Sequence, residues 1–185
     1  MRPAVFLDRD GVLNLSELRA GKPYAPRRCA DFQLYPEALP ALRRLSDAGF
    51  LLIVVTNQPD IGNNLADPAE VAAMNAQLAA VLPVAEVVMC PHSQSAGCAC
   101  RKPRPGMLLD AALRHDIDLT ASVMVGDRAG DVAAGQAAGC RTIWIDRGYA
   151  EPAPSNPDRI VASLSTAVDA ILANFRNDVS GDDIQ

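Results

Sequence analysis

Five short apolar segments rich in valine and isoleucine recur along the chain, and each has the length of a buried strand in a parallel sheet. The expected strands are Ala4–Leu7, Leu51–Val55, Glu86–Met89, Ser122–Val125 and Thr142–Ile145. Segments with helical spacing of apolar residues follow them, near Glu37–Ala48, Ala69–Val81, Met107–Arg114, Val132–Ala138 and Leu164–Asn174. This alternation predicts an α/β fold, a doubly wound parallel sheet with helices on both faces, whose ligands gather beyond the carboxyl ends of the strands.

The boundaries of these elements carry the residues that such boundaries favour. Gly49 and Gly139 stand where a helix ends in a left-handed residue, and Asp67-Pro68 stands where the second expected helix should begin. Asn156–Arg159 has the composition of a loop. At 185 residues the chain is expected to form one domain over residues 1–176, with a disordered polar tail over residues 177–185.

Composition excludes several classes of protein. The net charge is −5, which argues against binding nucleic acid or an anionic membrane through bulk charge. The longest apolar run, Phe50–Val55, is far shorter than the roughly 20 residues of a membrane-spanning helix. Asp8 interrupts the amino-terminal apolar segment too early for a secretory signal. We therefore expect a cytoplasmic protein with neither nucleic acid nor membrane as a partner. A monomer is expected as well, although no feature of the sequence determines the oligomeric state.

Three cysteines and one histidine crowd into eleven residues after the third expected strand. Cys90, His92, Cys98 and Cys100 form the ligand set of a closed structural Zn²⁺ site. The alternative is a set of buried thiols beside a surface histidine, but the segment is polar and contains glycine. The sequence thus predicts a zinc-binding loop, residues 90–100, which leads directly into Arg101 and Lys102.

Acidic residues follow two of the expected strands directly. Asp8 and Asp10 come after the first strand, and Asp127 follows the fourth, with Asp131 at the start of the next helix. If these strands are neighbours, their carboxylates repel one another unless a cation such as Mg²⁺ lies between them. Asp8 is then a candidate nucleophile, and Asp10 a candidate general acid and base. A single acid at a strand end is more often a loop cap, so the prediction depends on the combination.

Other polar residues at this edge of the sheet fit a phosphoryl group. Thr56, Asn57 and Gln58 end the second strand; the Thr56 hydroxyl and nearby backbone N–H groups can bind a phosphoryl oxygen. Lys102 can stabilise the charge that develops on phosphorus during in-line displacement. We expect Thr56 and Lys102 to take part in catalysis, and Asn57 and Gln58 to bind substrate.

Together these four segments resemble the motifs of the haloacid dehalogenase superfamily of aspartyl-phosphate phosphatases. The matching segments are Asp8-Arg9-Asp10-Gly11-Val12-Leu13-Asn14, Thr56-Asn57-Gln58, Arg101-Lys102-Pro103 and Gly126-Asp127-Arg128-Ala129-Gly130-Asp131. The resemblance implies a Mg²⁺ held by Asp8, the Asp10 main-chain carbonyl and Asp127, with Asp131 supporting the site. Only ten residues separate Gln58 from Ala69, so no large cap domain fits after the second strand.

The zinc-binding loop resembles the branch of this superfamily that contains heptose bisphosphate and histidinol-phosphate phosphatases. By that resemblance the chain removes the 7-phosphate of D-glycero-D-manno-heptose 1,7-bisphosphate, and Arg101 and Arg128 contact this small phosphorylated sugar. Where the heptose enzymes usually carry a basic residue, this chain has Asn63, so histidinol phosphate or another sugar phosphate is the alternative substrate. The non-enzyme alternatives are a receiver-like phospho-acceptor domain and a zinc-dependent interaction module.

Overall fold

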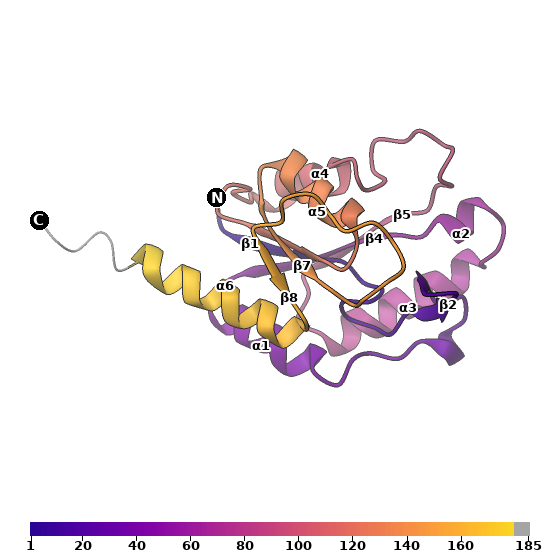
Figure 1. The fold of residues 1–185 in the computed structure, drawn as a ribbon, viewed down its shortest axis with the longest axis horizontal. Helices are drawn as coiled ribbons and strands as arrows, with labels where there is room; N and C mark the ends of the chain where they lie inside the picture. The colour runs from indigo at the N-terminus through magenta and orange to yellow at the C-terminus, as the bar shows by residue number, and fades with distance from the viewer. Residues whose placement is uncertain (180–185) are drawn as a thin grey trace, which may run out of the picture.

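The computed structural model describes the backbone of residues 1–179 and the side chains of residues 1–173. Its main sheet has six parallel strands in the order β5-β4-β1-β6-β7-β8 (Figure 1). The strands are β1 (Ala4–Leu7), β4 (Leu51–Asn57), β5 (Glu86–Cys90), β6 (Val123–Gly126), β7 (Arg141–Ile145) and β8 (Arg159–Val161). The five expected strands are confirmed. The sixth, β8, begins at Arg159, so that residue belongs to a strand and not to the expected loop.

Helices cover both faces of this sheet, which confirms the doubly wound α/β class. They are α1 (Ala38–Asp47), α3 (Pro68–Val81), α4 (Gly106–His115), α5 (Ala129–Ala138) and α6 (Leu164–Val179). Helices α1 and α6 lie side by side on one face together with α3, while α4 and α5 cover the other (Figure 1). Because α6 runs to Val179, residues 177–179 are helical and not part of the expected tail; residues 180–185 lie outside the described residues.

Alternation along each central strand divides the core into two layers. In β1, Val5 and Leu7 pack with α1, α3 and α6, whereas Ala4 and Phe6 pack with α4 and α5. All four side chains are fully buried, as expected for a strand that has helices on both sides. A strand with both faces buried reads as a continuous apolar run, which is why the short runs could be recognised in the sequence.

The chain order of the strands reverses at β1, and this reversal places the candidate site. Strand β1 pairs with β4 on one side and with β6 on the other, so the connections leave it in opposite directions. The backbone N–H of Asp8 donates to the Val125 carbonyl at 2.9 Å, which brings the end of β1 beside the end of β6. In open α/β sheets a crevice forms beyond the strand ends at such a switch point.

A small hairpin beyond β1 was not expected from the sequence. Strands β2 (Glu17–Arg19) and β3 (Lys22–Tyr24) pair antiparallel around Ala20 and Gly21, whose φ angles are +49° and +75°. Positive φ at both central residues is typical of a tight two-residue hairpin turn. The strands are only three residues long and one contains Pro23, so no alternating apolar pattern marks them. Two further short elements, a 3₁₀ turn (Cys29–Asp31) and α2 (Pro59–Gly62), were also missed.

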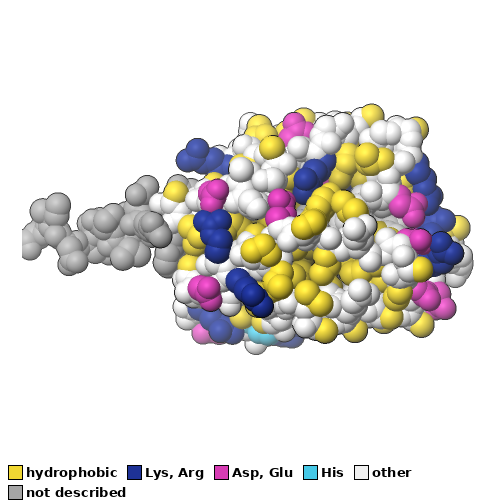
Figure 2. All heavy atoms as spheres, turned by 90° about the horizontal axis from the view of Figure 1, so that it is seen from below, with side chains coloured by type: hydrophobic (Ala, Val, Ile, Leu, Met, Phe, Trp, Pro, Cys, Tyr) yellow, Lys and Arg dark blue, Asp and Glu magenta, His cyan; other side chains and the backbone are white. Residues whose placement is uncertain are grey.

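The molecular surface carries charges of both signs. Figure 2 shows Lys and Arg side chains interspersed with Asp and Glu, and apolar atoms between them, on the face seen from below Figure 1. Within residues 1–179, no helix combines the length and the apolar character needed to cross a lipid bilayer.

Candidate active site

Three carboxylates from two neighbouring strand ends form the floor of the candidate site. Asp8 follows β1 directly and Asp127 follows β6, while Asp131 lies in the first turn of α5. One oxygen from each lies within 4.8 Å of the others, and all three residues are at least nine-tenths buried. Like charges so close in a poorly hydrated site repel one another unless a cation compensates them or a carboxylate takes up a proton.

Lys102 supplies part of that compensation. Its side chain is almost fully buried, and Nζ lies 2.8 Å from Asp8 Oδ1, 2.6 Å from Asp131 Oδ1 and 2.7 Å from the Val55 carbonyl oxygen. Although burial alone would lower the pKa of the Lys102 ammonium, the two carboxylates raise it above its ordinary value. The lysine is therefore a fixed positive charge in contact with Asp8.

Asn57 fixes the backbone that carries this lysine. Its amide Nδ2 donates to the Lys102 carbonyl at 3.0 Å, and its Oδ1 accepts from the Lys102 backbone N–H at 3.1 Å. This pair joins the end of β4 to the segment after the Cys/His loop, across 45 residues of sequence. Asn57 was expected to bind substrate; in the structure its side chain positions the Lys102 backbone.

One lysine does not neutralise three buried carboxylates. Burial raises the pKa of Asp8 to about 7, against the lowering effect of Lys102. Burial also raises the pKa of Asp127, with the Asp8 charge adding to the effect. Asp127 Oδ1 is buried and has no hydrogen-bond partner within the described residues. An unpartnered carboxylate oxygen beside two further carboxylates is a donor set that fits a hard cation such as Mg²⁺.

Asp10 is held at the wall of the site by three polar side chains. Oδ2 accepts from Gln58 Nε2 at 2.7 Å, and Oδ1 accepts from Asn14 Nδ2 at 3.0 Å and from the Arg9 guanidinium at 3.1 Å. Gln58 Nε2 also donates to the buried hydroxyl oxygen of Thr56 at 2.9 Å. Asp10, Thr56 and Gln58 therefore form one network, in which Gln58 orients the acid.

The fully buried Arg9 was not expected to contribute. Besides its contact with Asp10, it donates to Asn75 Oδ1 of α3 at 2.7 Å and lies over the Phe32 ring. Nothing in the sequence around Arg9 indicates that this side chain is buried. Only the tertiary structure shows that its guanidinium is enclosed and anchors the Asp10 carboxylate.

Asp131 has two roles in the geometry. Its Oδ2 accepts from the Arg128 backbone N–H at 2.9 Å, which satisfies a free donor at the start of α5. Its Oδ1 contacts Lys102. A Cβ atom on Gly126 would come within 2.1 Å of the Asp131 Cβ, so only glycine lets the end of β6 approach this side chain.

A cavity of about 610 Å³ opens above these residues. Its floor and walls include Asp8, Asp10, Asn57, Gln58, Arg101, Lys102, Arg128 and Asp131. The β2–β3 hairpin contributes Lys22, Pro23 and Tyr24, and the loop after β7 contributes Ala150, Glu151 and Pro152. As expected, residues 1–179 form no large cap over the site; these short segments form its walls instead.

The two arginines that were expected to contact substrate differ in their pairing. Arg128 is bonded through Nε and Nη2 to the Glu151 carboxylate, at 2.8 and 2.6 Å. Arg101 has a buried Nη1 without a hydrogen-bond partner in the described part of the chain. Glu151 was missed in the sequence because nothing local distinguishes it from any exposed acid near prolines. Its presence means that Arg128 already has an anionic partner inside the cavity.

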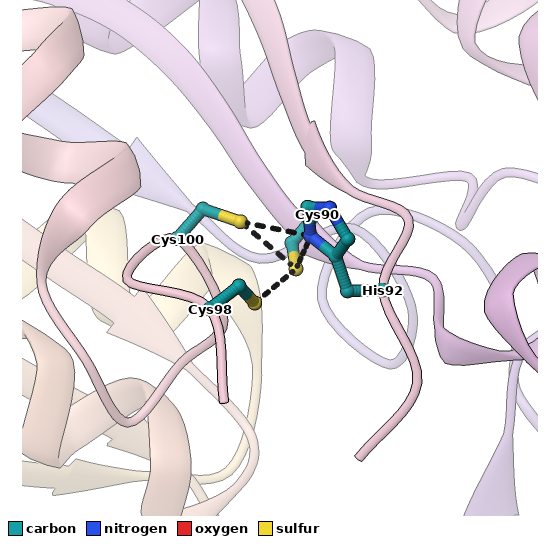
Figure 3. A group of neighbouring side chains, drawn as sticks. All are labelled: Cys90, His92, Cys98 and Cys100. Carbon is teal, nitrogen blue, oxygen red and sulfur yellow. Dashed lines mark hydrogen bonds between the residues drawn. The ribbon is translucent and has the colours of Figure 1, made fainter. Parts of the chain in front are cut away.

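The four predicted zinc ligands come together at the end of β5 (Figure 3). Cys90 Sγ lies 3.2 Å from Cys100 Sγ and 3.6 Å from Cys98 Sγ, and His92 Nδ1 lies 3.3 Å from Cys100 Sγ. Tetrahedral coordination with metal–sulfur bonds of about 2.3 Å requires ligand separations near 3.8 Å, close to these values. The spacing and the donor set fit Zn²⁺.

The Cys/His loop packs tightly between two helices beside the cavity. A Cβ atom on Gly62 of α2 would meet the Ser93 backbone nitrogen at 2.4 Å, and one on Gly106 of α4 would meet the Ala99 carbonyl oxygen at 2.5 Å. Asn63 donates to Gln94 Oε1 at 2.9 Å, and Gln94 lines the cavity. The loop thereby connects the α2 segment to Arg101 and Lys102.

Comparisons with known proteins agree with this geometry. A family model described as "HAD-hyrolase-like" matches residues 99–167. The chain is 35% identical over 155 residues to the D-glycero-beta-D-manno-heptose-1,7-bisphosphate 7-phosphatase of Pseudomonas aeruginosa, covering 80% of this chain and 83% of the relative. The chain belongs to the haloacid dehalogenase-like phosphatases.

Two further relatives of this phosphatase cover nearly its whole length. The D-glycero-D-manno-heptose-1,7-bisphosphate 7-phosphatase of Thermosynechococcus vestitus is 36% identical over 197 residues, covering 94% of this chain and 97% of the relative. The crystal structure of a D,D-heptose 1,7-bisphosphate phosphatase from Bordetella bronchiseptica, complexed with magnesium and phosphate, superposes with a TM-score of 0.79 at 32% identity. It covers 94% of this chain and 99% of that chain.

Membership in this family decides between the alternatives that the sequence left open. The relatives are phosphatases, so the receiver-like domain and the zinc-dependent interaction module are set aside. The chain is an enzyme that hydrolyses phosphoric monoesters.

Proposed function

We propose that this phosphatase removes the 7-phosphate of D-glycero-D-manno-heptose 1,7-bisphosphate through an aspartyl-phosphate intermediate on Asp8. The observation that carries the proposal is the buried Asp8 carboxylate on the floor of the cavity, 2.8 Å from the Lys102 ammonium. The names of relatives at 35% and 36% identity support the choice of substrate.

The reaction has two displacement steps. An Asp8 oxygen attacks phosphorus, the bond from phosphorus to the sugar oxygen breaks, and Asp10 gives its proton to that oxygen. Asp10 then takes a proton from water, the water oxygen attacks phosphorus, and the bond from phosphorus to Asp8 breaks. Inorganic phosphate leaves and both carboxylates return to their starting forms. The contact from Gln58 to Asp10 keeps the acid at the wall of the site through both steps.

The remaining groups stabilise charge. Lys102 lies where it can balance negative charge on the transferred group, and the Thr56 hydroxyl and the residues after it line the same edge. Asp8, the Asp10 main-chain carbonyl and Asp127 would hold Mg²⁺, which when bound neutralises charge on the phosphoryl oxygens. Asp131 supports this set through Lys102.

Zn²⁺ has a structural role in this proposal. Cys90, His92, Cys98 and Cys100 would complete a four-ligand shell, which leaves no open position for chemistry. The metal would hold the loop that positions Arg101 and Lys102 over the floor. Loss of zinc is then expected to disorder the site rather than to remove a reacting group.

One observation favours a second candidate substrate. The Glu151 carboxylate occupies two N–H groups of Arg128, which reduces the positive charge available for a second phosphate. Asn63, in place of a cation, contacts Gln94 and adds no charge. Histidinol phosphate or another sugar monophosphate is therefore the second candidate.

A phosphate-release assay tests the proposal. Heptose 1,7-bisphosphate, heptose 7-phosphate and histidinol phosphate are compared at equal Mg²⁺, and ³¹P NMR identifies which phosphate is removed. We expect kcat/KM for the bisphosphate to be at least about tenfold higher than for the other two, equivalent to about 1.4 kcal/mol, with heptose 1-phosphate as product. A preference for histidinol phosphate, or release of the 1-phosphate, would overturn the assignment. Asp8→Asn provides the inactive control.

A further inference from the structure

A tyrosine from the loop after β7 contacts one of the three floor carboxylates. Tyr149 Oη donates to Asp127 Oδ2 at 2.8 Å, and the other oxygen of that carboxylate, Oδ1, is buried and has no hydrogen-bond partner among the described residues. The two oxygens of Asp127 therefore have different environments, and only one is free for a further ligand.

The surroundings of this contact hold both partners in place. A Cβ atom on Gly11 would lie 1.8 Å from Asp127 Oδ2 and 2.7 Å from Tyr149 Oη, so the loop after β1 packs directly against the pair. Arg147 Nε donates to the Gly11 carbonyl at 2.9 Å. Trp144 Nε1 donates to the Asp127 carbonyl at 3.0 Å. Side chains from β7 and the loop after it thus fix the backbone and the carboxylate of Asp127.

We infer that Tyr149 is a positioning residue for Mg²⁺: it binds Asp127 Oδ2 so that Oδ1 faces the cation site. The inference rests on the proposed function, which assigns Asp127 as a Mg²⁺ ligand. A carboxylate that is free to rotate must be ordered when a metal binds, whereas one held by a hydrogen bond is ordered beforehand. Loss of such a partner to a metal ligand typically weakens metal affinity by about 10- to 100-fold.

The test compares Mg²⁺ binding in two variants that each lose one hydroxyl. Tyr149→Phe removes the donor to Asp127. Tyr35→Phe is the matched control, because Tyr35 is a neighbouring half-buried tyrosine whose ring lies 4.5 Å from the Arg147 guanidinium. Calorimetric titration of the zinc-loaded, substrate-free enzyme with MgCl₂ gives the Kd, and phosphate release at rising Mg²⁺ gives the half-saturating concentration. Circular dichroism checks that both variants fold.

We expect Tyr149→Phe to bind Mg²⁺ about 10- to 100-fold more weakly, to raise the half-saturating Mg²⁺ concentration similarly, and to retain kcat within a few-fold at saturating Mg²⁺. Tyr35→Phe should match the wild type. Tyr149→His, which keeps a ring donor, should fall between them and serves as the second variant if Tyr149→Phe does not fold.

Two different results would overturn the inference. If the wild type binds Mg²⁺ and the Kd of Tyr149→Phe lies within twofold of the wild-type Kd, Tyr149 does not position Asp127 for Mg²⁺. The proposed function then stands. If the wild type itself binds no Mg²⁺ and hydrolyses no phosphoester, the proposed function fails and takes the inference with it. The titration without substrate separates these cases.

Discussion

Lys102→Met is the most informative single change to this site. The substitution removes an ammonium that contacts Asp8 Oδ1 at 2.8 Å, Asp131 Oδ1 at 2.6 Å and the Val55 carbonyl oxygen at 2.7 Å. Methionine fills a similar volume without a charge. The variant therefore leaves two buried carboxylates without their shared counter-ion and one carbonyl without its donor.

The burial of these side chains sets the size of the expected stability loss. Lys102 is only 4% exposed and both carboxylate residues are below 10%, so solvent screens these contacts weakly. Removing one partner from a buried ion pair typically costs about 3–5 kcal/mol, because an uncompensated charge remains. At about 2–4 °C per kcal/mol for a chain of this size, the melting temperature should fall by roughly 6–20 °C. Added Mg²⁺ should recover part of this loss by supplying positive charge to the same carboxylates.

The assay is urea denaturation and thermal melting with Mg²⁺ chelated, followed by the same measurements in excess Mg²⁺. A pH of 8 is chosen because at lower pH the carboxylates escape repulsion by taking up protons. Lys22→Met, the same chemical change at an exposed position of β3, is the matched control and should cost less than about 0.5 kcal/mol. A loss below about 0.5 kcal/mol for Lys102→Met, no larger than that of the control, would refute the view that Asp8 and Asp131 depend on this lysine.

Three further predictions follow from the site. Asp8→Asn should reduce phosphate release below a few per cent of wild type, since an amide cannot attack phosphorus. Asp10→Asn should leave phosphoryl-enzyme that mass spectrometry can detect. Substantial turnover by Asp8→Asn would exclude Asp8 as the nucleophile. Elemental analysis of protein purified without added metal should give about one zinc per chain, and folded, active protein well below that ratio would contradict the Cys/His site. Arg128→Ala should lower kcat/KM for a bisphosphate by about 10- to 100-fold and kcat/KM for a monophosphate far less. Glu151→Gln, which removes the anionic partner of Arg128, should raise kcat/KM for the bisphosphate a few-fold. If Arg128→Ala lowers kcat/KM equally for both substrates, Arg128 does not contact the second phosphate.

Features that depend on local patterning could be predicted from the sequence alone. The apolar runs of β1, β4 and β6 are recognisable because helices bury both faces of each strand. The edge strand β5 and strand β7 are recognisable from their valine and isoleucine residues, although several of their side chains are only partly buried or exposed. Gly49 and Gly139 adopt φ angles of +91° and +83° at helix ends, as their positions indicated. Asp8 and Asp10 are adjacent to one strand end, and the four Cys/His ligands lie within eleven residues, so short-range spacing was sufficient to group each set.

The tertiary structure alone decided how distant residues pair within the site. Tyr149 contacts Asp127 across 22 residues, Asn57 binds the Lys102 backbone across 45, and Arg9 reaches Asn75 across 66. None of these contacts can be recognised from periodicity or composition, because each depends on a single polar residue that only the folded chain brings to its partner. The β2–β3 hairpin and Glu151 shape the cavity for the same reason: three-residue strands and a single acid carry too little local pattern to be placed before the sheet brings them to the site. Spacing along the chain therefore determined which groups are available for chemistry, and packing of the sheet edge determined which of them are paired, buried or free.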